Sequence, residues 1–287
     1  MTTTTAFLPR SAGRGPVIAL HCSGSGAGQW RQLGDALGPG YELIAPEHYG
    51  TESAGPWTGE HAFTLADEAE RTLALIDRAC GPVHLVGHSY GGGVALRVAI
   101  ERPGRIASLS LYEPTTFHVL KELGADGATA LSEIGTVARI VSARVITGDY
   151  RGAAATFVDY WNGPCAWSGL RPQVQAALAR WAPKAPLDFC ALIDERTLAA
   201  SYRRIRAPML IMRGEHAPAP TRLIAGMLTT FPTAHLAVVG GAGHMGPITH
   251  AGDVNRHILR HIAATSERAS QQHRARVAHH VPEEAVA

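Results

Sequence analysis

Short apolar runs recur along most of the chain, and each is closed by glycine, proline or a polar residue. They occupy Val17–Cys22, Tyr41–Ala45, Val83–His88, Ile106–Tyr112, Met209–Arg213 and His235–Val239. Runs of this length with turn residues at their ends are typical of buried strands in a parallel sheet. The pattern therefore predicts a sheet built from these six segments.

Helical patterns fill the intervals between the runs. Thr64 is followed three positions later by Asp67, which is typical of a capping box, and apolar residues then recur on one helical face at Leu65, Ala69, Leu73 and Ile76. The segment Gly92–Arg102 is small and apolar, as in a helix that packs closely on a sheet. Alternating strands and helices indicate right-handed βαβ units. We therefore expect an α/β fold with a mainly parallel central sheet flanked by helices.

The alternation stops between residues 117 and 206. This stretch is rich in alanine and leucine, carries Trp161, Trp167 and Trp181, and has no convincing strand run. It predicts a helical lid inserted into a core formed by residues 1–116 and 207–265. Residues 266–287 are polar and end in an acidic cluster, so we expect a flexible tail there.

Composition and charge narrow the class of protein. The 287 residues are 46% hydrophobic and 17% charged, with a net charge of +2, which is ordinary for a globular protein and does not indicate nucleic acid as a partner. No apolar run approaches the ~20 residues of a membrane span, and the first residues lack the pattern of a secretory signal. The four cysteines form no close pair, so we expect reduced thiols and a cytoplasmic location.

Candidate chemistry centres on the G-x-S-x-G pentapeptide Gly87-His88-Ser89-Tyr90-Gly91. It follows a predicted strand and precedes a predicted helix, which is the context of a nucleophile elbow. Small residues beside the serine allow a sharp turn that projects its hydroxyl above the sheet. A serine hydroxyl is a poor nucleophile at neutral pH, so it needs a nearby imidazole to accept its proton.

The elbow and three further segments resemble the α/β-hydrolase family over residues 17–262. The segments are the loop His21–Trp30, in which Cys22 stands where the family usually has glycine, the strand end Leu111–Pro114, and the glycine-rich Gly240–His244. The resemblance implies the family's fold and an enzyme that needs no metal and no organic cofactor.

The same resemblance implies roles for individual residues. Ser89 corresponds to the nucleophile and His244 to its base, in the family's chain order of serine, then histidine. Backbone N–H groups of Ser23 and Tyr90 correspond to the oxyanion hole. His257 and His261 lie four residues apart, but without a third ligand they do not predict a metal site.

The acid that would orient the histidine departs from the family's commonest pattern. A G-x-x-D sequence often follows the penultimate strand, but here the residues are Gly214-Glu215-His216-Ala217, with alanine at the acid position. Some family members carry the acid after the preceding strand, where this chain has Glu113. We prefer Glu113 as the acid and keep Glu215 as the alternative.

These features predict a serine hydrolase that cleaves a carboxylic ester or a similar small acyl substrate through an acyl-serine intermediate. The same serine could instead carry out C–C bond hydrolysis, amide hydrolysis, acyl transfer or perhydrolysis. A different class is a ligand-binding module without catalysis, which the missing acid at Ala217 would favour.

Overall fold

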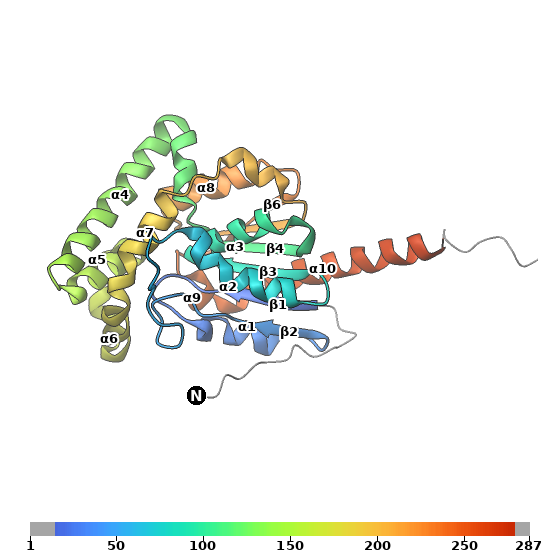
Figure 1. Cartoon of the computed structure of the whole chain (residues 1–287), viewed down its shortest axis with the longest axis horizontal. Helices are drawn as coiled ribbons and strands as arrows, with labels where there is room; N and C mark the ends of the chain where they lie inside the picture. The colour runs from blue at the N-terminus through green and yellow to red at the C-terminus, as the bar shows by residue number, and fades with distance from the viewer. Residues whose placement is uncertain (1–14, 279–287) are drawn as a thin grey trace, which may run out of the picture.

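A six-stranded parallel sheet forms the centre of the computed structural model, which describes residues 15–278 (Figure 1). The strand order is β2-β1-β3-β4-β5-β6, and every neighbouring pair is parallel. The strands are β1 (Gly15–Leu20), β2 (Tyr41–Ile44), β3 (Val83–His88), β4 (Ile106–Tyr112), β5 (Met209–Gly214) and β6 (Ala234–Val239). The predicted sheet is confirmed.

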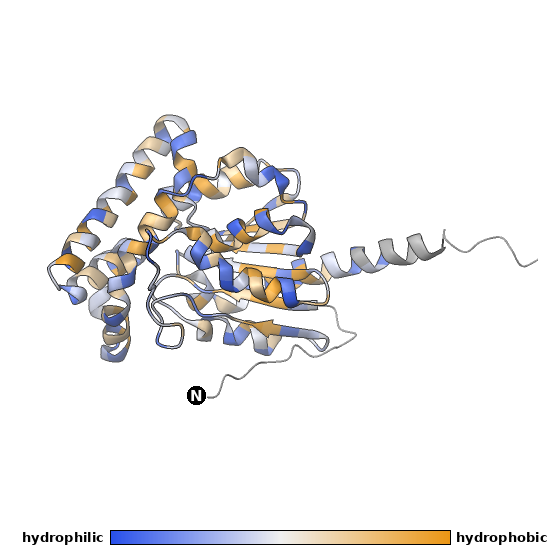
Figure 2. Cartoon of the chain, in the orientation of Figure 1, coloured by the Kyte–Doolittle hydropathy of each residue, from blue (hydrophilic) through white to orange (hydrophobic). Residues whose placement is uncertain are grey.

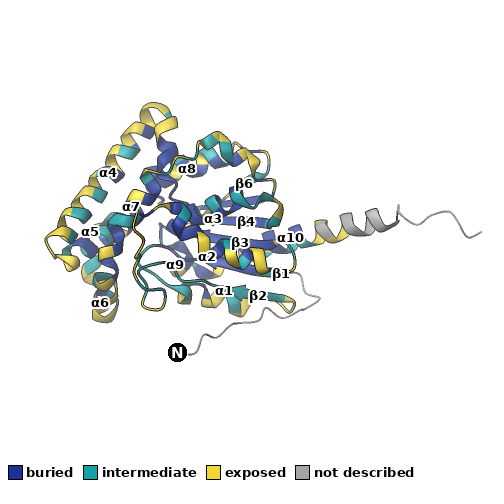
Figure 3. Cartoon of the chain, viewed as in Figure 1, coloured by how far each residue is buried: buried dark blue, intermediate teal, exposed yellow. Residues whose placement is uncertain are grey.

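Helices cover both faces of this sheet. One face packs against α1 (Arg31–Ala36) and α10 (Ala251–Ala278) through a smaller apolar cluster. The other packs against α2 (Leu65–Arg78), α3 (Tyr90–Glu101) and α8 (Ala219–Leu228) through the larger one. The strands are largely apolar (Figure 2), and the residues between the helical layers are buried (Figure 3). The predicted flanking helices are confirmed.

The start of α2 has the capping geometry that the sequence predicts. The Thr64 hydroxyl accepts a hydrogen bond from the Asp67 N–H, and the Asp67 carboxylate accepts one from the Thr64 N–H at 2.8 Å. Two amide groups that the helix would otherwise leave unpaired are thereby satisfied. Leu65, Ala69 and Ile76 on the inner face of α2 are buried in the larger core.

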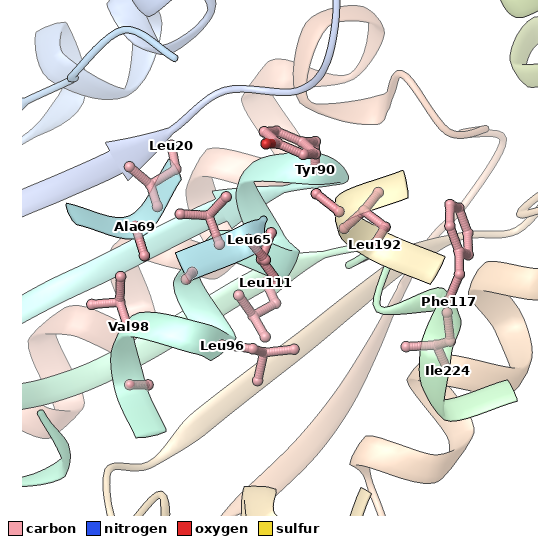
Figure 4. Packing of buried hydrophobic residues seen from close by; sticks show 14 of the residues in the cluster. Leu20, Leu65, Ala69, Tyr90, Leu96, Val98, Leu111, Phe117, Leu192 and Ile224 are labelled. Carbon is pink, nitrogen blue, oxygen red and sulfur yellow. The ribbon is translucent and has the colours of Figure 1, made fainter. Parts of the chain in front are cut away.

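Between β4 and β5 the described chain forms only helices, and they lie together beyond one end of the sheet (Figure 1). The longer ones are α4 (Gly124–Ile146), α5 (Tyr150–Asn162), α6 (Pro172–Trp181) and α7 (Ala185–Ile193). The carboxyl ends of β3 and β4 point toward this helical segment. Tyr90, which follows β3, and Phe117, which follows β4, belong to the same apolar cluster as Leu192 of α7 (Figure 4).

The last helix, α10, extends to Ala278, beyond residue 266 where we expected a flexible tail to begin. Residues 266–278 contain Ala, Arg, Glu and Gln, which favour helix, and no glycine or proline. A polar composition is therefore compatible here with a continued helix. The expected tail beyond residue 278 and the expectation about the first residues lie outside the described residues. No helix within residues 15–278 is long and apolar enough to cross a membrane.

Helix α3 approaches the sheet so closely that a side chain at Gly91 or Gly92, in its first turn, would collide with neighbouring residues. A Cβ atom on Gly91 would collide with the carbonyl oxygens of Leu20 and His21 on the neighbouring strand end. One on Gly92 would lie 2.9 Å from the ring of Pro114. The helix can therefore begin directly at the end of β3, with no intervening loop.

Replacing Gly91 with alanine should destabilise the fold, because backbone oxygens cannot move aside as a side chain can. We expect Gly91→Ala to lower the free energy of unfolding by about 1–3 kcal/mol, as for other overpacked sites. A Cβ on Gly135 in α4 would meet no other atom within 4 Å, so Gly135→Ala should raise the free energy of unfolding by about 0.5–1 kcal/mol. Urea unfolding of both variants checks the pair, and similar effects would contradict the packing argument.

Candidate active site

Ser89 occupies the turn between β3 and α3 in a backbone conformation that side chains rarely adopt. Its φ is +53° and its ψ is −117°. Hydrogen bonds hold this conformation: the Ser89 N–H donates to the Tyr112 carbonyl at 3.0 Å, and the Ser89 carbonyl accepts from the N–H groups of Gly92 and Thr115 at 2.9 and 3.2 Å. Such strain persists where the surroundings enforce it, and it is concentrated at functional sites.

His244 lies on the loop after β6, with its ring against the serine. Its Nε2 is 2.9 Å from the Ser89 Oγ, and the ring is buried. The indole of Trp161, from α5, stacks on the imidazole with ring centroids 3.9 Å apart and an angle of 21°. This contact restricts rotation of the ring, and an aromatic face also stabilises a neighbouring cation.

Glu113 completes a hydrogen-bonded chain from its position just after β4. Its Oε2 is 2.8 Å from Nδ1 of His244, and the side chain is fully buried. The carboxylate also accepts hydrogen bonds from the Gly214 N–H at 2.9 Å and the Thr221 hydroxyl at 3.0 Å. Because a carboxylate only accepts, Nδ1 carries the proton of the neutral ring, and Nε2 is left to accept from the Ser89 hydroxyl.

The alternative acid, Glu215, lies elsewhere. Its carboxylate accepts a hydrogen bond from the Gly241 N–H at 2.8 Å in an exposed position. Within the described residues it makes no hydrogen bond or ion pair with His244. The structure therefore brings Glu113, and not Glu215, to the imidazole.

The two amides expected to form an oxyanion hole flank the serine. Tyr90 follows Ser89 directly, and Ser23 lines a cavity together with Ser89. The neighbouring Cys22 N–H donates to the Gln29 side chain at 3.2 Å. Within residues 15–278, the N–H groups of Ser23 and Tyr90 donate to no protein acceptor. Both amides are therefore available to donate to a bound oxygen atom.

His88, the residue before the serine, has polar partners on both ring nitrogens. Its Nε2 donates to the His244 carbonyl at 2.8 Å, and its Nδ1 accepts from the Gln29 amide at 3.1 Å. A buried chain of hydrogen bonds thus joins the Cys22 loop to the His244 loop. The partners are far apart in sequence, so no local pattern could have revealed this chain.

A buried cluster of charged side chains, comprising Glu68, Lys184 and Asp188, lies beside the Ser23 loop. The Lys184 Nζ is 2.9 Å from the Glu68 carboxylate and 2.5 Å from the Asp188 carboxylate. Asp188 accepts a hydrogen bond from the Ser23 hydroxyl at 2.6 Å, and Glu68 accepts one from the Tyr90 hydroxyl at 2.8 Å. The cluster connects α2 and α7 to both residues whose amides flank the serine, and sequence reasoning missed it.

Opposite charges keep this cluster compatible with burial. Burial alone would raise the pKa of Glu68, but neighbouring His48 and Lys184 hold the pKa of that carboxyl below its ordinary value. Burial would likewise lower the pKa of Lys184, and the two carboxylates instead raise it. Removing one partner from such a group leaves an uncompensated buried charge, which is strongly unfavourable.

Two cavities open beside Ser89. The larger, which we call the wide cavity, has a volume of about 670 Å³ and is lined on one side by α6 and on the other by His244, Met245 and Ile248. The smaller, the narrow cavity, has a volume of about 10 Å³ and is closed by Phe117, Phe189 and Leu192, among others. The serine is therefore accessible to a small molecule.

Within residues 15–278, no group of three or more His, Cys, Asp or Glu side chains is arranged to bind a metal ion. His261 instead contacts the Pro208 carbonyl at 3.2 Å. The four cysteines are free thiols in the structure. The polar side chains around Ser89 are the imidazole of His244 and, in the wall of the narrow cavity, Ser23, Thr115 and Asp188.

Comparison with known proteins agrees with this architecture. The sequence model of the "Alpha/beta hydrolase family" matches residues 17–257. Lipase LipV of Mycobacterium tuberculosis is 29% identical over 164 residues, which cover 57% of this chain and 55% of LipV. The 2-hydroxy-6-oxo-6-phenylhexa-2,4-dienoate hydrolase of Burkholderia cepacia is 34% identical over 109 residues, which cover 36% of this chain and 38% of that enzyme. The chain thus matches about half of one relative and over a third of the other.

Solved structures show the same fold. A hydrolase from Pseudomonas aeruginosa superimposes with a TM-score of 0.69 at 22% identity, covering 86% of this chain and 89% of that one. The family match spans most of the chain and the sheet topology agrees with it. The chain belongs to the α/β-hydrolase family.

Acid should destabilise this protein through its buried histidines. Burial, reinforced by nearby His244, lowers the pKa of His88 well below its ordinary value, and burial lowers the pKa of His261 to about 4. The unfolded chain protonates histidine near pH 6.5 and so binds more protons than the folded one below that pH. The contribution of these histidines to the free energy of unfolding should be fully present above about pH 6.5 and should be lost as the pH falls below that value.

His88→Gln isolates one part of this effect, because glutamine can donate to the His244 carbonyl but does not titrate. A histidine that stays neutral in the folded protein lowers the free energy of unfolding by about 2 kcal/mol between pH 7 and pH 5, because the unfolded chain takes up a proton there. The variant should therefore lose correspondingly less stability than the native chain over that interval, as measured by urea unfolding at each pH. Equal losses would show that the His88 ring is protonated in the folded protein.

Proposed function

We propose that this protein is a serine hydrolase that cleaves a carboxylic ester or a similar small acyl substrate. The observation that carries the proposal is the hydrogen-bonded chain from Ser89 through His244 to Glu113, in which every side chain is buried and the imidazole lies between the hydroxyl and the carboxylate. A lipase among the relatives supports the ester class.

In the first half-reaction the Ser89 Oγ attacks the acyl carbon while His244 Nε2 accepts its proton. Glu113 stabilises the resulting imidazolium through Nδ1, and the stacked indole of Trp161 adds to this stabilisation. The amides of Ser23 and Tyr90 bind the oxyanion. The imidazolium then protonates the departing alcohol, which leaves an acyl-serine. Attack by water, activated by the same imidazole, releases the acid and restores the serine.

We also propose that residues 117–206 act as a lid that shapes the substrate site. This segment contributes Phe157, Trp161 and Leu178 to the wide cavity and Phe189 and Leu192 to the narrow one. The core contributes the serine, the imidazole and the carboxylate. Substrate choice is then largely a property of the helical segment, while the chemistry belongs to the sheet.

The binding-module alternative rested on the missing acid at Ala217. Glu113 supplies a carboxylate to the same imidazole from the neighbouring strand, which removes the reason to favour that alternative. Ligand binding alone would also require neither the Ser89–His244–Glu113 chain nor the strained backbone at Ser89. Hydrolysis is therefore the function that the site supports best.

Ser89→Ala tests the nucleophile. We expect the variant to lose hydrolysis of hexyl acetate and covalent labelling by a fluorophosphonate, because no other hydroxyl within residues 15–278 is hydrogen-bonded to the His244 ring. Its circular dichroism and melting temperature should stay close to those of the native protein, since alanine keeps the turn and its backbone hydrogen bonds. Labelling that persists in a folded variant would identify a different nucleophile and reject the proposal.

Glu113→Gln tests the acid, with Glu215→Gln as the matched control. An amide cannot stabilise the imidazolium and can favour the wrong tautomer, so kcat should fall by up to about 10⁴-fold in the first variant. The control removes a carboxylate outside the proton-transfer chain and should change kcat by less than about tenfold. A large loss of kcat in Glu215→Gln together with a nearly native kcat in Glu113→Gln would reverse the assignment.

A further inference from the structure

The wide and narrow cavities meet at the serine and differ greatly in size. They share Ser23, Ser89, Phe157 and Trp161 in their walls, so both open onto the same reacting centre. Their volumes are about 670 Å³ and about 10 Å³. An ester bound at Ser89 extends in two directions from its reacting carbon, and the two cavities offer very unequal space for its two halves.

The position of His244 decides which half enters which cavity. Its ring lines the wide cavity and not the narrow one. Nε2 must deliver its proton to the departing oxygen, so that oxygen and the alcohol attached to it lie on the His244 side. The acyl substituent then points away from His244, into the narrow cavity.

The narrow cavity admits a group about as large as one water molecule, which is comparable to a methyl group. Phe117, Phe189 and Leu192 form much of its wall, and all three are buried in the larger core. Three polar residues, Ser23, Thr115 and Asp188, line the rest of it together with Ser89 and two aromatic rings. Figure 4 shows Phe117 and Leu192 among the packed side chains of that core. Close packing of this kind does not yield to an added methylene without strain.

Two contacts prevent the wall of the narrow cavity from retreating. Asp188, on the same short helix as Phe189 and Leu192, is held by Lys184 and by the Ser23 hydroxyl. Leu192 also packs against the first turn of α3, where its Cδ2 lies 2.8 Å from the point at which Gly93 would carry a Cβ. The helix that closes the cavity is thus anchored to the elbow on one side and to the buried charges on the other.

The wide cavity has a mainly apolar wall. Leu170, Val174 and Leu178 line it from α6 and the residues just before that helix, and Met245 and Ile248 line it next to the catalytic imidazole. Its volume is large enough for an alcohol of many carbon atoms. An apolar wall favours an apolar alcohol, since burial removes hydrocarbon surface from water.

We infer that the substrate class is acetyl esters of larger, apolar alcohols, with the acetyl methyl in the narrow cavity and the alcohol in the wide cavity beside His244. This inference rests on the proposed serine hydrolase and specifies its substrate. The bond broken lies between the acetyl carbon and the alcohol oxygen, and the products with water are acetate and the free alcohol.

Two isomeric esters test the orientation directly. Hexyl acetate and methyl heptanoate have the same atoms, but the long chain is on the alcohol in the first and on the acid in the second. One misplaced methylene in a close-fitting pocket changes kcat/KM by about tenfold or more, so hexyl acetate should be preferred by at least about tenfold. Equal rates, or a preference for methyl heptanoate, would overturn the inference while leaving the hydrolase intact.

The same assay separates failure of the inference from failure of the proposed function. Both esters would be inert, and Ser89 would resist the fluorophosphonate, if the protein were no serine hydrolase. Labelling of Ser89 together with turnover of methyl heptanoate alone would reject only the assigned orientation. Release of acid is followed by titration at constant pH, which reports both esters without a chromophore that could alter binding.

Enlarging the narrow cavity should change acyl selectivity. We expect Leu192→Ala to raise the ratio of kcat/KM for hexyl butanoate to that for hexyl acetate by at least about tenfold, because the removed side chain makes room for two methylenes. Leu178→Ala is the matched control, since it alters the wide cavity, and its ratio should stay within about twofold of the native value.

If Leu192→Ala fails to fold, Phe189→Leu is a second variant that enlarges the narrow cavity. It removes less buried side-chain volume than a change to alanine would. Thermal unfolding of each variant establishes that it is folded before kinetics are measured. A butanoate-to-acetate ratio that stays native in a folded variant of the narrow cavity, or that rises equally in Leu178→Ala, would overturn the placement of the acyl group.

Discussion

The positive φ of Ser89 is the constraint on which the rest of the site depends. A chain that turns this sharply from β3 into α3 brings the helix against neighbouring strand ends, where the missing side chains of Gly91 and Gly92 leave room for the approach. The Ser89 carbonyl then accepts a hydrogen bond from Thr115. This contact ties the elbow to the segment after β4, where Glu113 also has a positive φ of 43°. Strain at both residues is sustained by the packed structure around them.

Parallel topology explains how a carboxylate from an unusual position reaches the imidazole. β4 and β5 are neighbours in the sheet, so their carboxyl ends lie at the same edge. Glu113, at the end of β4, is bound by the Gly214 N–H at the end of β5 and by Thr221 at the start of α8. The strand after which the acid more often lies in this family thus supplies an N–H donor to Glu113.

Buried polar groups connect the helical segment to the chemistry of the core. The cluster of Glu68, Lys184 and Asp188 joins α7 to α2, to the Ser23 hydroxyl and to the Tyr90 hydroxyl. Burying three charges is unfavourable unless each is paired, and here each has a partner. The cluster therefore makes the position of α7, and with it the shape of the narrow cavity, dependent on the same contacts that hold the loop beside the serine.

Local sequence determined the elements and the elbow that presents Ser89. The strand runs, the capping box at Thr64 and the elbow around Ser89 are readable because each depends on residues close together in the chain. Resemblance to a family also predicted His244 as the base and favoured Glu113 as the acid. The choice between Glu113 and Glu215 stayed open in the sequence, because it depends on which side chain reaches a ring that is distant along the chain. Tertiary structure decided that contact, the hydrogen bonds of His88 and the sizes of the two cavities. It also decided the buried cluster of Glu68, Lys184 and Asp188. All of these arise from side chains on separate elements, whose distances are set by packing and leave no periodic signal in the sequence.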